Sequence, residues 1–115
     1  MINVLIVDDD ILCITAIKCM IKPYCNIQCA NNGKEAINIF KNNNINLILM
    51  DINMPILDGY EATKEIRKID KNVIIIAQTT IKEKDKSFEV GCNDHITKTF
   101  YKKSLFNVIK KYIEI

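Results

Sequence analysis

Three continuous runs of apolar residues mark this chain, at residues 4–7, 47–50 and 73–77. Strands of a parallel sheet covered by helices on both faces have such runs, whereas strands with one exposed face alternate apolar and polar residues. Two weaker runs, at residues 27–30 and 94–97, predict two further strands. The pattern therefore predicts five parallel strands.

Between the strands, apolar residues recur every three or four positions, which is the spacing of one helix face. The predicted order is a strand followed by a helix, five times. The apolar helix positions are Ile11, Ile14, Ile17 and Ile21, then Ile37 and Phe40, then Ala62, Ile66 and Ile69, and finally Leu105, Val108, Ile109 and Tyr112.

Turn-forming residues agree with these boundaries, because Pro23 ends the first helix and Asp58-Gly59 opens the third. Right-handed crossovers between parallel strands leave few topologies. The simplest is an α/β fold with a doubly wound five-stranded parallel sheet in strand order 2-1-3-4-5, the flavodoxin-like (βα)5 arrangement. A length of 115 residues predicts one domain, residues 1–115.

The composition argues against nucleic-acid-binding and membrane proteins. The 16 basic and 14 acidic side chains form no long block, so neither nucleic acid nor a membrane surface is an expected partner. The first apolar run meets Asp8 too early for a signal peptide, and no run approaches the roughly 20 residues of a membrane span. We expect a cytoplasmic protein whose five cysteines are reduced and packed as small apolar residues.

Candidate chemistry lies where the strands end. Asp8 and Asp9 follow the first strand and Asp51 follows the third, so in adjacent parallel strands they meet at the edge where such sheets bind ligands. Each pair of like charges repels by roughly 4 kcal/mol at an effective dielectric of about 20, so the cluster needs a cation or protons. A hard divalent cation is the natural partner for such oxygen ligands. Asp10, in contrast, is expected to be a helix N-cap, and Asp58 is expected to be a cap or turn residue before Gly59.

These acids belong to longer motifs. Residues 7–10 read VDDD, residues 50–62 read MDINMPILDGYEA, and Thr79 and Lys98 follow. In this order and spacing the set resembles the receiver domain of two-component response regulators, and its central stretch resembles the receivers of hybrid sensor histidine kinases. The resemblance implies a phosphorelay signalling domain that promotes only its own phosphorylation and dephosphorylation and is not otherwise an enzyme.

The resemblance also assigns roles to the residues of this chain. Asp51 would accept a phosphoryl group from a phosphohistidine of a sensor histidine kinase or a histidine phosphotransfer protein. Mg²⁺ would be held by Asp8, Asp9, Asp51 and the backbone carbonyl of Asn53. Lys98 would neutralise the phosphoryl oxygens from the side opposite the metal.

Thr79 and His95 occupy the positions of the family's conformational switch. A phosphoryl group adds about −1.5 to −2 charge and strong acceptor oxygens, so the Thr79 hydroxyl gains a partner only in the phosphorylated state. Such a difference shifts a conformational equilibrium. His95 lies where receivers carry an aromatic residue that changes rotamer with the threonine. The downstream effector is left open, as is a homodimer.

The chain departs from the family pattern in two places. Lys98 is followed by Thr99 instead of proline, and a cis bond before a residue other than proline costs about 2.5 to 4 kcal/mol. We therefore predict a trans Lys98-Thr99 bond. The segment 79–91 is shorter than usual by roughly one turn of helix, which predicts a short fourth helix, and Phe88 is expected to pack inward.

Three alternatives stay open. A degenerate receiver would bind partners without phosphorylation, and Thr99 and the short fourth helix motivate this reading. A haloacid-dehalogenase-like phosphatase also uses a nucleophilic aspartate after a strand, but it needs a general acid two residues later, where this chain has Asn53. A flavodoxin-like binding module needs a phosphate loop after the first strand, where two acids would repel a flavin phosphate.

Overall fold

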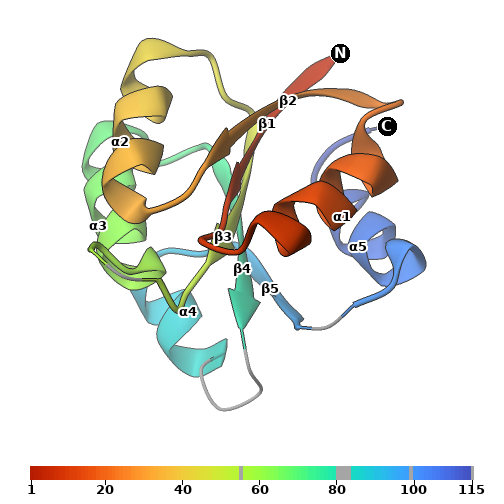
Figure 1. Ribbon diagram of the computed structural model, residues 1–115. Coiled ribbons are helices and arrows are strands. Elements are labelled where there is room, and N and C mark those ends of the chain that lie inside the picture. The colour runs from red at the N-terminus through yellow and green to blue at the C-terminus, as the bar shows by residue number, and fades with distance from the viewer. Residues whose placement is uncertain (55, 80–83, 99, 115) are drawn as a thin grey trace.

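The computed structural model describes residues 1–54, 56–79, 84–98 and 100–114. A parallel sheet with the strand order β2-β1-β3-β4-β5 forms its centre, and helices cover both faces (Figure 1). The predicted doubly wound fold is therefore confirmed. The elements are β1 (Ile2–Val7), α1 (Ile11–Ile21), β2 (Cys25–Ala30), α2 (Gly33–Asn42), β3 (Leu47–Asp51), α3 (Gly59–Ile69), β4 (Ile74–Thr79), α4 (Lys84–Val90), β5 (Asp94–Thr97) and α5 (Lys102–Ile109).

The two faces of the sheet carry separate apolar cores. Helices α1 and α5 cover one face, and α2, α3 and α4 cover the other (Figure 1). Along β1, Val4 and Ile6 pack on the α1–α5 side, while Leu5 and Val7 pack on the opposite side. Because successive side chains point to opposite faces, both sets must be apolar, which explains the continuous runs in the sequence.

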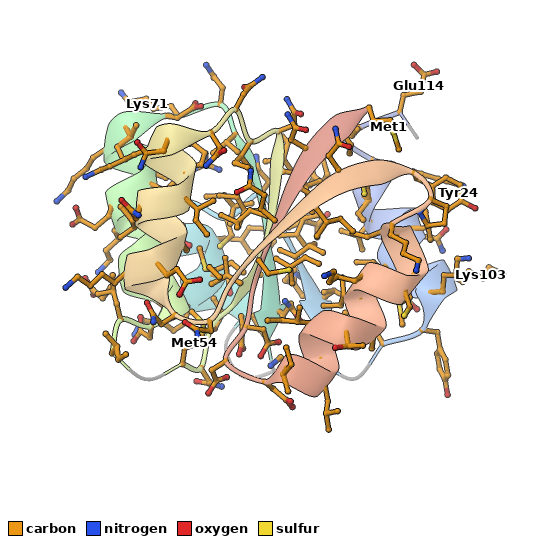
Figure 2. The ribbon with its side chains drawn as sticks, turned by 45° about the horizontal axis from the view of Figure 1, so that its top comes forward. Met1, Tyr24, Met54, Lys71, Lys103 and Glu114 are labelled. Carbon is orange, nitrogen blue, oxygen red and sulfur yellow. The ribbon has the colours of Figure 1, made fainter. Side chains whose placement is uncertain are left out.

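The ends of the chain lie at the edge of the sheet where β1 begins (Figure 1). Figure 2 shows Met1 and Glu114 near each other at this edge, with Tyr24 and Lys103 on the α1–α5 side and Lys71 on the α2–α3 side. The carboxyl ends of the strands point to the opposite edge. Within the described ranges, no helix has the length and apolar character that a membrane crossing requires.

The strand limits differ from the predicted ones by a few residues. Strand β1 begins at Ile2 and β2 begins at Cys25, each two residues earlier than the apolar runs indicate. Strand β4 begins at Ile74 and continues through two polar residues to Thr79. Gln78 and Thr79 belong to the strand because their backbones pair with β3 and β5. Their polar side chains gave no indication of this in the sequence.

Some residues predicted on apolar helix faces are exposed. Ile11, the first residue of α1, is 69% exposed, and Ile69, the last residue of α3, is 49% exposed. Helix α5 ends at Ile109, so Tyr112 follows the helix and does not belong to its buried face. All five cysteines are free as predicted, but Cys19 is exposed and does not pack as an apolar residue.

The predicted N-caps are confirmed. The Asp10 carboxylate accepts a hydrogen bond from the backbone N–H of Leu12 at 2.9 Å at the start of α1. The Asp58 carboxylate accepts one from the backbone N–H of Glu61 at 3.0 Å at the start of α3. Each bond satisfies a donor that the first helical turn leaves without an intrahelical partner.

Helix α4 spans seven residues and is the shortest of the described helices, as predicted. The expectation that Phe88 packs inward is wrong, because Phe88 is 46% exposed. The buried position belongs to Ser87, and the next residue is turned by about 100° around the helix axis. The Phe88 ring instead packs edge to face against the His95 ring, with centroids 5.6 Å apart. The Lys98-Thr99 bond lies outside the described residues.

A guanidinium group connects α3 to the segments around β4 and β5. Arg67 donates through Nη1 to the Val73 carbonyl at 2.7 Å and through Nε to the Gly91 carbonyl at 2.9 Å. It also donates through Nη2 to Oδ1 of Asn93 at 2.8 Å. The end of α3, the start of β4 and the turn after α4 are therefore joined by one side chain.

Ile56 has a backbone conformation that β-branched residues rarely adopt, with φ at 73° and the side chain 78% exposed. We predict that Ile56→Gly raises the free energy of unfolding by about 1 kcal/mol, because glycine adopts this conformation without steric cost. Urea unfolding measures the effect. Ile56→Ala keeps the Cβ atom and should gain less than Ile56→Gly, and a destabilised glycine variant would contradict the prediction.

Candidate functional site

The structure brings the three predicted acids together. Asp8 and Asp9 follow β1 directly and Asp51 is the last residue of β3, the strand paired with β1. One carboxylate oxygen of each residue lies within 4.8 Å of those of the other two. Asp8 and Asp51 are buried and Asp9 is exposed. The adjacent parallel strands thus place a cluster of carboxylates at their common carboxyl edge.

Lys98 supplies a positive charge to this cluster from the end of β5. Its Nζ lies 3.0 Å from Oδ1 of Asp51 and 3.5 Å from Oδ2 of Asp8. Its backbone N–H donates to the Thr79 carbonyl at 3.1 Å, which holds the lysine beside the end of β4. One ammonium therefore faces two buried carboxylates, and with Asp9 included the cluster keeps an excess of negative charge.

The oxygen atoms of the cluster fit a hard divalent cation. Among the described residues, Oδ2 of Asp51 is buried without a hydrogen bond, and Oδ2 of Asp8 has an ion pair with Lys98 but no hydrogen bond. Buried polar atoms are nearly always satisfied, so these oxygens require a further partner. Mg²⁺ takes carboxylate and carbonyl oxygens together with water. Asn53 lies beside the cluster, since its backbone N–H donates to Oδ1 of Asp51 at 3.3 Å.

Burial dominates the electrostatics of Asp51. Burial raises the pKa of Asp51 from its usual 3.8 to about 6, and the hydrogen bond from Lys98 opposes this rise. Repulsion by Asp8 raises the pKa of Asp51 further. For Lys98, burial lowers the pKa, but the hydrogen bond and the charge of Asp51 outweigh burial and the net direction is upward. Lys98 therefore remains positively charged throughout the pH range in which Asp51 titrates.

The raised pKa of Asp51 predicts a pH-dependent stability. The folded protein binds more protons at Asp51 than the unfolded chain between pH 3.8 and about 6, so the free energy of unfolding falls as the pH rises through this window. The difference between the pKa of Asp51 in the folded protein and in the unfolded chain corresponds to a free energy of about 3 kcal/mol as an upper limit. Without Mg²⁺, Asp51→Asn should therefore stabilise the protein by about 1 to 3 kcal/mol at pH 7.5, with little gain at pH 4.

Chemical unfolding across this pH range measures the effect of Asp51→Asn. Asp58→Asn is the matched control, because asparagine keeps the N-cap of α3 and Asp58 lies outside the acid cluster. A gain that stays constant from pH 4 to pH 7.5, or an equal gain in the control, would contradict the assignment of the effect to Asp51.

Thr79 is the last residue of β4 and is 1% exposed. In the part of the chain that the structure describes, its Oγ1 has no hydrogen-bond partner. The residue before it, Gln78, pairs in register with Asp51 across the sheet, so Thr79 lies at the same carboxyl edge as the acids. A hydroxyl group can both donate and accept a hydrogen bond.

His95 lies on β5 and connects the sheet to α4. Its backbone pairs with Ala77 of β4, and its ring contacts Phe88 of α4. Nδ1 of His95 lies 3.8 Å from Oδ1 of Asp94, and no hydrogen bond to Nδ1 is found within the described ranges. His95 is thus a contact between β5 and α4, and it does not belong to the acid cluster.

Gln78 was missed by sequence reasoning. It is 2% exposed, and its side-chain Nε2 has no hydrogen-bond partner among the described residues. The signal in the sequence was a polar residue between the apolar run 73–77 and Thr79. An apolar run does not show whether the polar residue after it still belongs to the strand. The pairing of Gln78 with Asp51 in the sheet shows that it does.

The protein is an α/β domain with a doubly wound parallel sheet and a cluster of acids at the carboxyl edge of that sheet. The family model of the response regulator receiver domain matches residues 4–110, and the chain belongs to this family. It is a receiver domain of the kind found in phosphorelay systems. The match favours this function over the phosphatase and flavodoxin-like alternatives.

Two relatives show how receivers occur in longer proteins. The probable transcriptional regulator ycf29 of Porphyra purpurea is 33% identical over 96% of this chain, which spans 56% of that protein. The hybrid signal transduction histidine kinase I of Dictyostelium discoideum is 37% identical over 97% of this chain, which spans 7% of that protein. The chain thus spans about half the length of the first relative and a small part of the second.

Two solved structures share the fold. One is the co-crystal structure of the Saccharomyces cerevisiae histidine phosphotransfer signaling protein Ypd1 and the receiver domain of its downstream response regulator Ssk1, with a TM-score of 0.91 and 34% identity over 96% of this chain and 88% of the matched chain. The other is the response regulator TrrA of Thermotoga maritima in complex with Mg²⁺-BeF, with a TM-score of 0.91 and 30% identity over 98% and 100% of the two chains.

Proposed function

We propose that residues 1–115 act as one receiver domain in which Asp51 accepts a phosphoryl group from a phosphohistidine. The observation that carries this proposal is the buried Asp51 carboxylate, which has one oxygen beside the Lys98 ammonium group and the other without a hydrogen bond to any described residue. In the transfer, a bond forms between the Asp51 oxygen and phosphorus as the bond from phosphorus to the partner's imidazole nitrogen breaks. The product is an aspartyl phosphate on this chain and a free histidine on the partner.

The residues around Asp51 have two roles in this transfer, which are metal binding and charge neutralisation. Asp8, Asp9, Asp51 and the backbone carbonyl of Asn53 would hold Mg²⁺, which neutralises phosphoryl oxygens when it is bound. Lys98 fixes the Asp51 carboxylate and neutralises the phosphoryl group from another side. Phosphoryl transfer needs positioning and charge neutralisation more than covalent help from the protein, and these groups supply both. The Mg²⁺-BeF complex of TrrA supports the metal assignment.

Thr79 and His95 form the switch in this proposal. The Thr79 hydroxyl donates a hydrogen bond to the phosphoryl group, whereas it has no partner among the described residues of the unmodified protein. Movement of Thr79 changes the end of β4, which lies next to β5 and therefore next to His95. His95 packs against Phe88, so a change in its rotamer reaches the surface of α4.

The proposed phosphodonor is a sensor histidine kinase or a histidine phosphotransfer protein. The similarity to the Ssk1 receiver, which was crystallised with Ypd1, and to a hybrid histidine kinase supports this class of partner. The output is binding to an effector protein in the cytoplasm, without direct contact to nucleic acid or membrane. In this proposal the domain does not turn over a separate substrate, and the homodimer stays an alternative mode of output.

Intact-mass analysis after incubation with Mg²⁺ and acetyl phosphate tests the proposal. We expect one added phosphoryl group on the unmodified protein, and none on Asp51→Asn or after chelation of Mg²⁺. Absence of the adduct on a folded, Mg²⁺-loaded protein would favour a degenerate receiver, which Thr99 in place of proline motivates. Repeated turnover of an added phosphomonoester would instead indicate a phosphatase.

A further inference from the structure

Helix α5 and the turn after α1 form a hollow of about 590 Å³ at the surface. The residues that line it are Tyr24, Lys102, Lys103, Phe106, Asn107 and Lys110. Tyr24 and Lys103 mark its position in Figure 2. No carboxylate of the described residues lines the hollow, and it shares no residue with the acid cluster or with Thr79 and His95. It is therefore a positively charged surface separate from the site already described.

Two aromatic rings form the apolar part of the hollow. The rings of Tyr24 and Phe106 pack edge to face, with centroids 5.2 Å apart. Tyr24 is 45% exposed and Phe106 is partly exposed, so their contact leaves ring surface open to solvent. Exposed rings in a hollow provide a contact area for an apolar or aromatic side chain of a partner.

The lysines of the hollow have no acidic partner. Elsewhere on the surface, lysines of the same protein pair with acids, as Lys64 does with Glu61 at 3.4 Å. In the described part of the chain, no ion pair involves Lys102, Lys103 or Lys110. The three positive charges of the hollow are therefore not neutralised by neighbouring side chains.

Contacts with the rings hold two of these ammonium groups at the hollow. Nζ of Lys102 lies 5.6 Å from the centroid of the Phe106 ring and 5.9 Å from that of Tyr24. Nζ of Lys110 lies 5.9 Å from the centroid of Phe106. Such contacts are weak at exposed sites. They nevertheless reduce the conformational freedom that the two lysines lose when they bind an anion.

The lysines at the start of α5 do not stabilise the helix that carries them. Lys102 and Lys103 are its first two residues, and its first turn contains no acid. Helices α2 and α3 instead have Glu35 and Glu61 in their first turns, which is the favourable arrangement with the helix dipole. A local rule that is broken in this way is typical of a surface used for binding.

The positive charges of the hollow extend over two turns of α5. Lys102 and Lys110 are eight residues apart, which corresponds to about 12 Å along the helix axis. A single carboxylate or phosphate group is too small to contact both lysines, whereas about four residues of an extended chain span this distance. We propose that the hollow binds an acidic segment of a partner protein. Its carboxylates contact Lys102 and Lys110 while an aromatic side chain between them packs on Tyr24 and Phe106.

The small number of charges favours a protein segment over nucleic acid or a membrane. Proteins that bind these polyanions commonly use about four to ten basic side chains, and the hollow has three lysines. The proposed binding involves neither Asp51 nor Mg²⁺. The acidic partner therefore binds the unphosphorylated domain, and the surface goes beyond the proposed phosphorelay function.

Tryptophan fluorescence tests this binding, because the chain itself contains no tryptophan. The probe is the peptide GDEWDEG, blocked at both ends, and the matched control peptide GNQWNQG has the same length and ring without the carboxylates. The protein is titrated into each peptide at low salt without Mg²⁺. We expect a saturable rise in the anisotropy of the tryptophan emission for GDEWDEG, and binding of GNQWNQG at least about tenfold weaker.

Two double variants with the same net charge test the location of the site. Lys102→Gln/Lys110→Gln should weaken binding of GDEWDEG about tenfold, because each exposed lysine–carboxylate contact contributes a factor of roughly two to five. Lys41→Gln/Lys71→Gln removes two charges on the α2–α3 side of the sheet and should change the affinity less than about twofold. Urea unfolding of both variants shows that they are folded.

The proposal is overturned by the absence of a saturable rise up to about 1 mM protein, by equal binding of the two peptides, or by equal weakening in the two double variants. Tighter binding of poly(U) or of phosphatidylserine vesicles than of GDEWDEG, lost in Lys102→Gln/Lys110→Gln, would also overturn it. That result would assign the surface to nucleic acid or to a membrane. Because neither Mg²⁺ nor a phosphodonor is present, the outcome is independent of phosphorylation at Asp51.

Discussion

Replacement of Lys98 by methionine is expected to slow phosphorylation by acetyl phosphate about a hundredfold or more. The ammonium group lies 3.0 Å from Oδ1 of Asp51 and is positioned before any phosphoryl group arrives. Removal of one such preorganised donor typically costs a factor of about 10² to 10³ in rate. Methionine keeps an unbranched side chain as far as Cε and removes the ammonium group. The rate of adduct formation by intact mass measures the effect.

Mg²⁺ binding separates this effect from a loss of structure. Without the positive charge of Lys98, the three carboxylates repel one another more strongly, so Lys98→Met should bind Mg²⁺ at least as tightly as the unmodified protein. Lys103→Met is the control, because Lys103 is an exposed residue of α5 away from the acids. A Lys98→Met variant that is phosphorylated at the normal rate would exclude the proposed role of this lysine.

Replacement of Gly59 by alanine is expected to destabilise the fold by about 3 kcal/mol. A Cβ atom at Gly59 would overlap the Asp51 carbonyl oxygen and lie 2.8 Å from the Ile52 Cα. Both neighbours are backbone atoms, so α3 must shift away from the end of β3. The Gly59 N–H also donates to the Ile52 carbonyl at 3.0 Å, and this bond would lengthen.

The same shift should weaken Mg²⁺ binding, because Asp51 lies directly at the contact with Gly59. Urea unfolding measures the stability and calorimetric titration measures the Mg²⁺ affinity. Glu61→Ala is the control in the same helical turn, since its ion pair with Lys64 is half exposed and should contribute about 0.5 kcal/mol or less. An unchanged unfolding midpoint for Gly59→Ala would show that α3 moves without cost.

The sheet and the acid cluster could be predicted because each depends on a rule that acts within a short segment. Both faces of the strands are covered, so residues 4–7 of β1 and 47–50 of β3 form unbroken apolar runs, and the acids that come directly after these runs must meet at one edge. The N-cap role of Asp10 was also predictable, because the first helical turn needs an acceptor there.

The surroundings of the site were less predictable, because they depend on contacts between distant segments. Phe88 is apolar, yet its neighbour Ser87 takes the buried side of α4, and the sequence does not show how α4 is rotated. Gln78 is polar, yet its pairing with Asp51 carries it into the sheet. Local pattern gives the type of an element, whereas the rotation of a short helix and the last residues of a strand are decided by packing.

The guanidinium of Arg67 has a consequence for how α4 can move. It binds the carbonyl of Gly91, directly after the last residue of α4, and so fixes the carboxyl end of this helix to α3. Any displacement of α4 would then be a rotation about that end. Over a helix of seven residues, about 10 Å long, the amplitude grows toward Lys84, which makes the first turn the segment with the largest travel for an effector to detect.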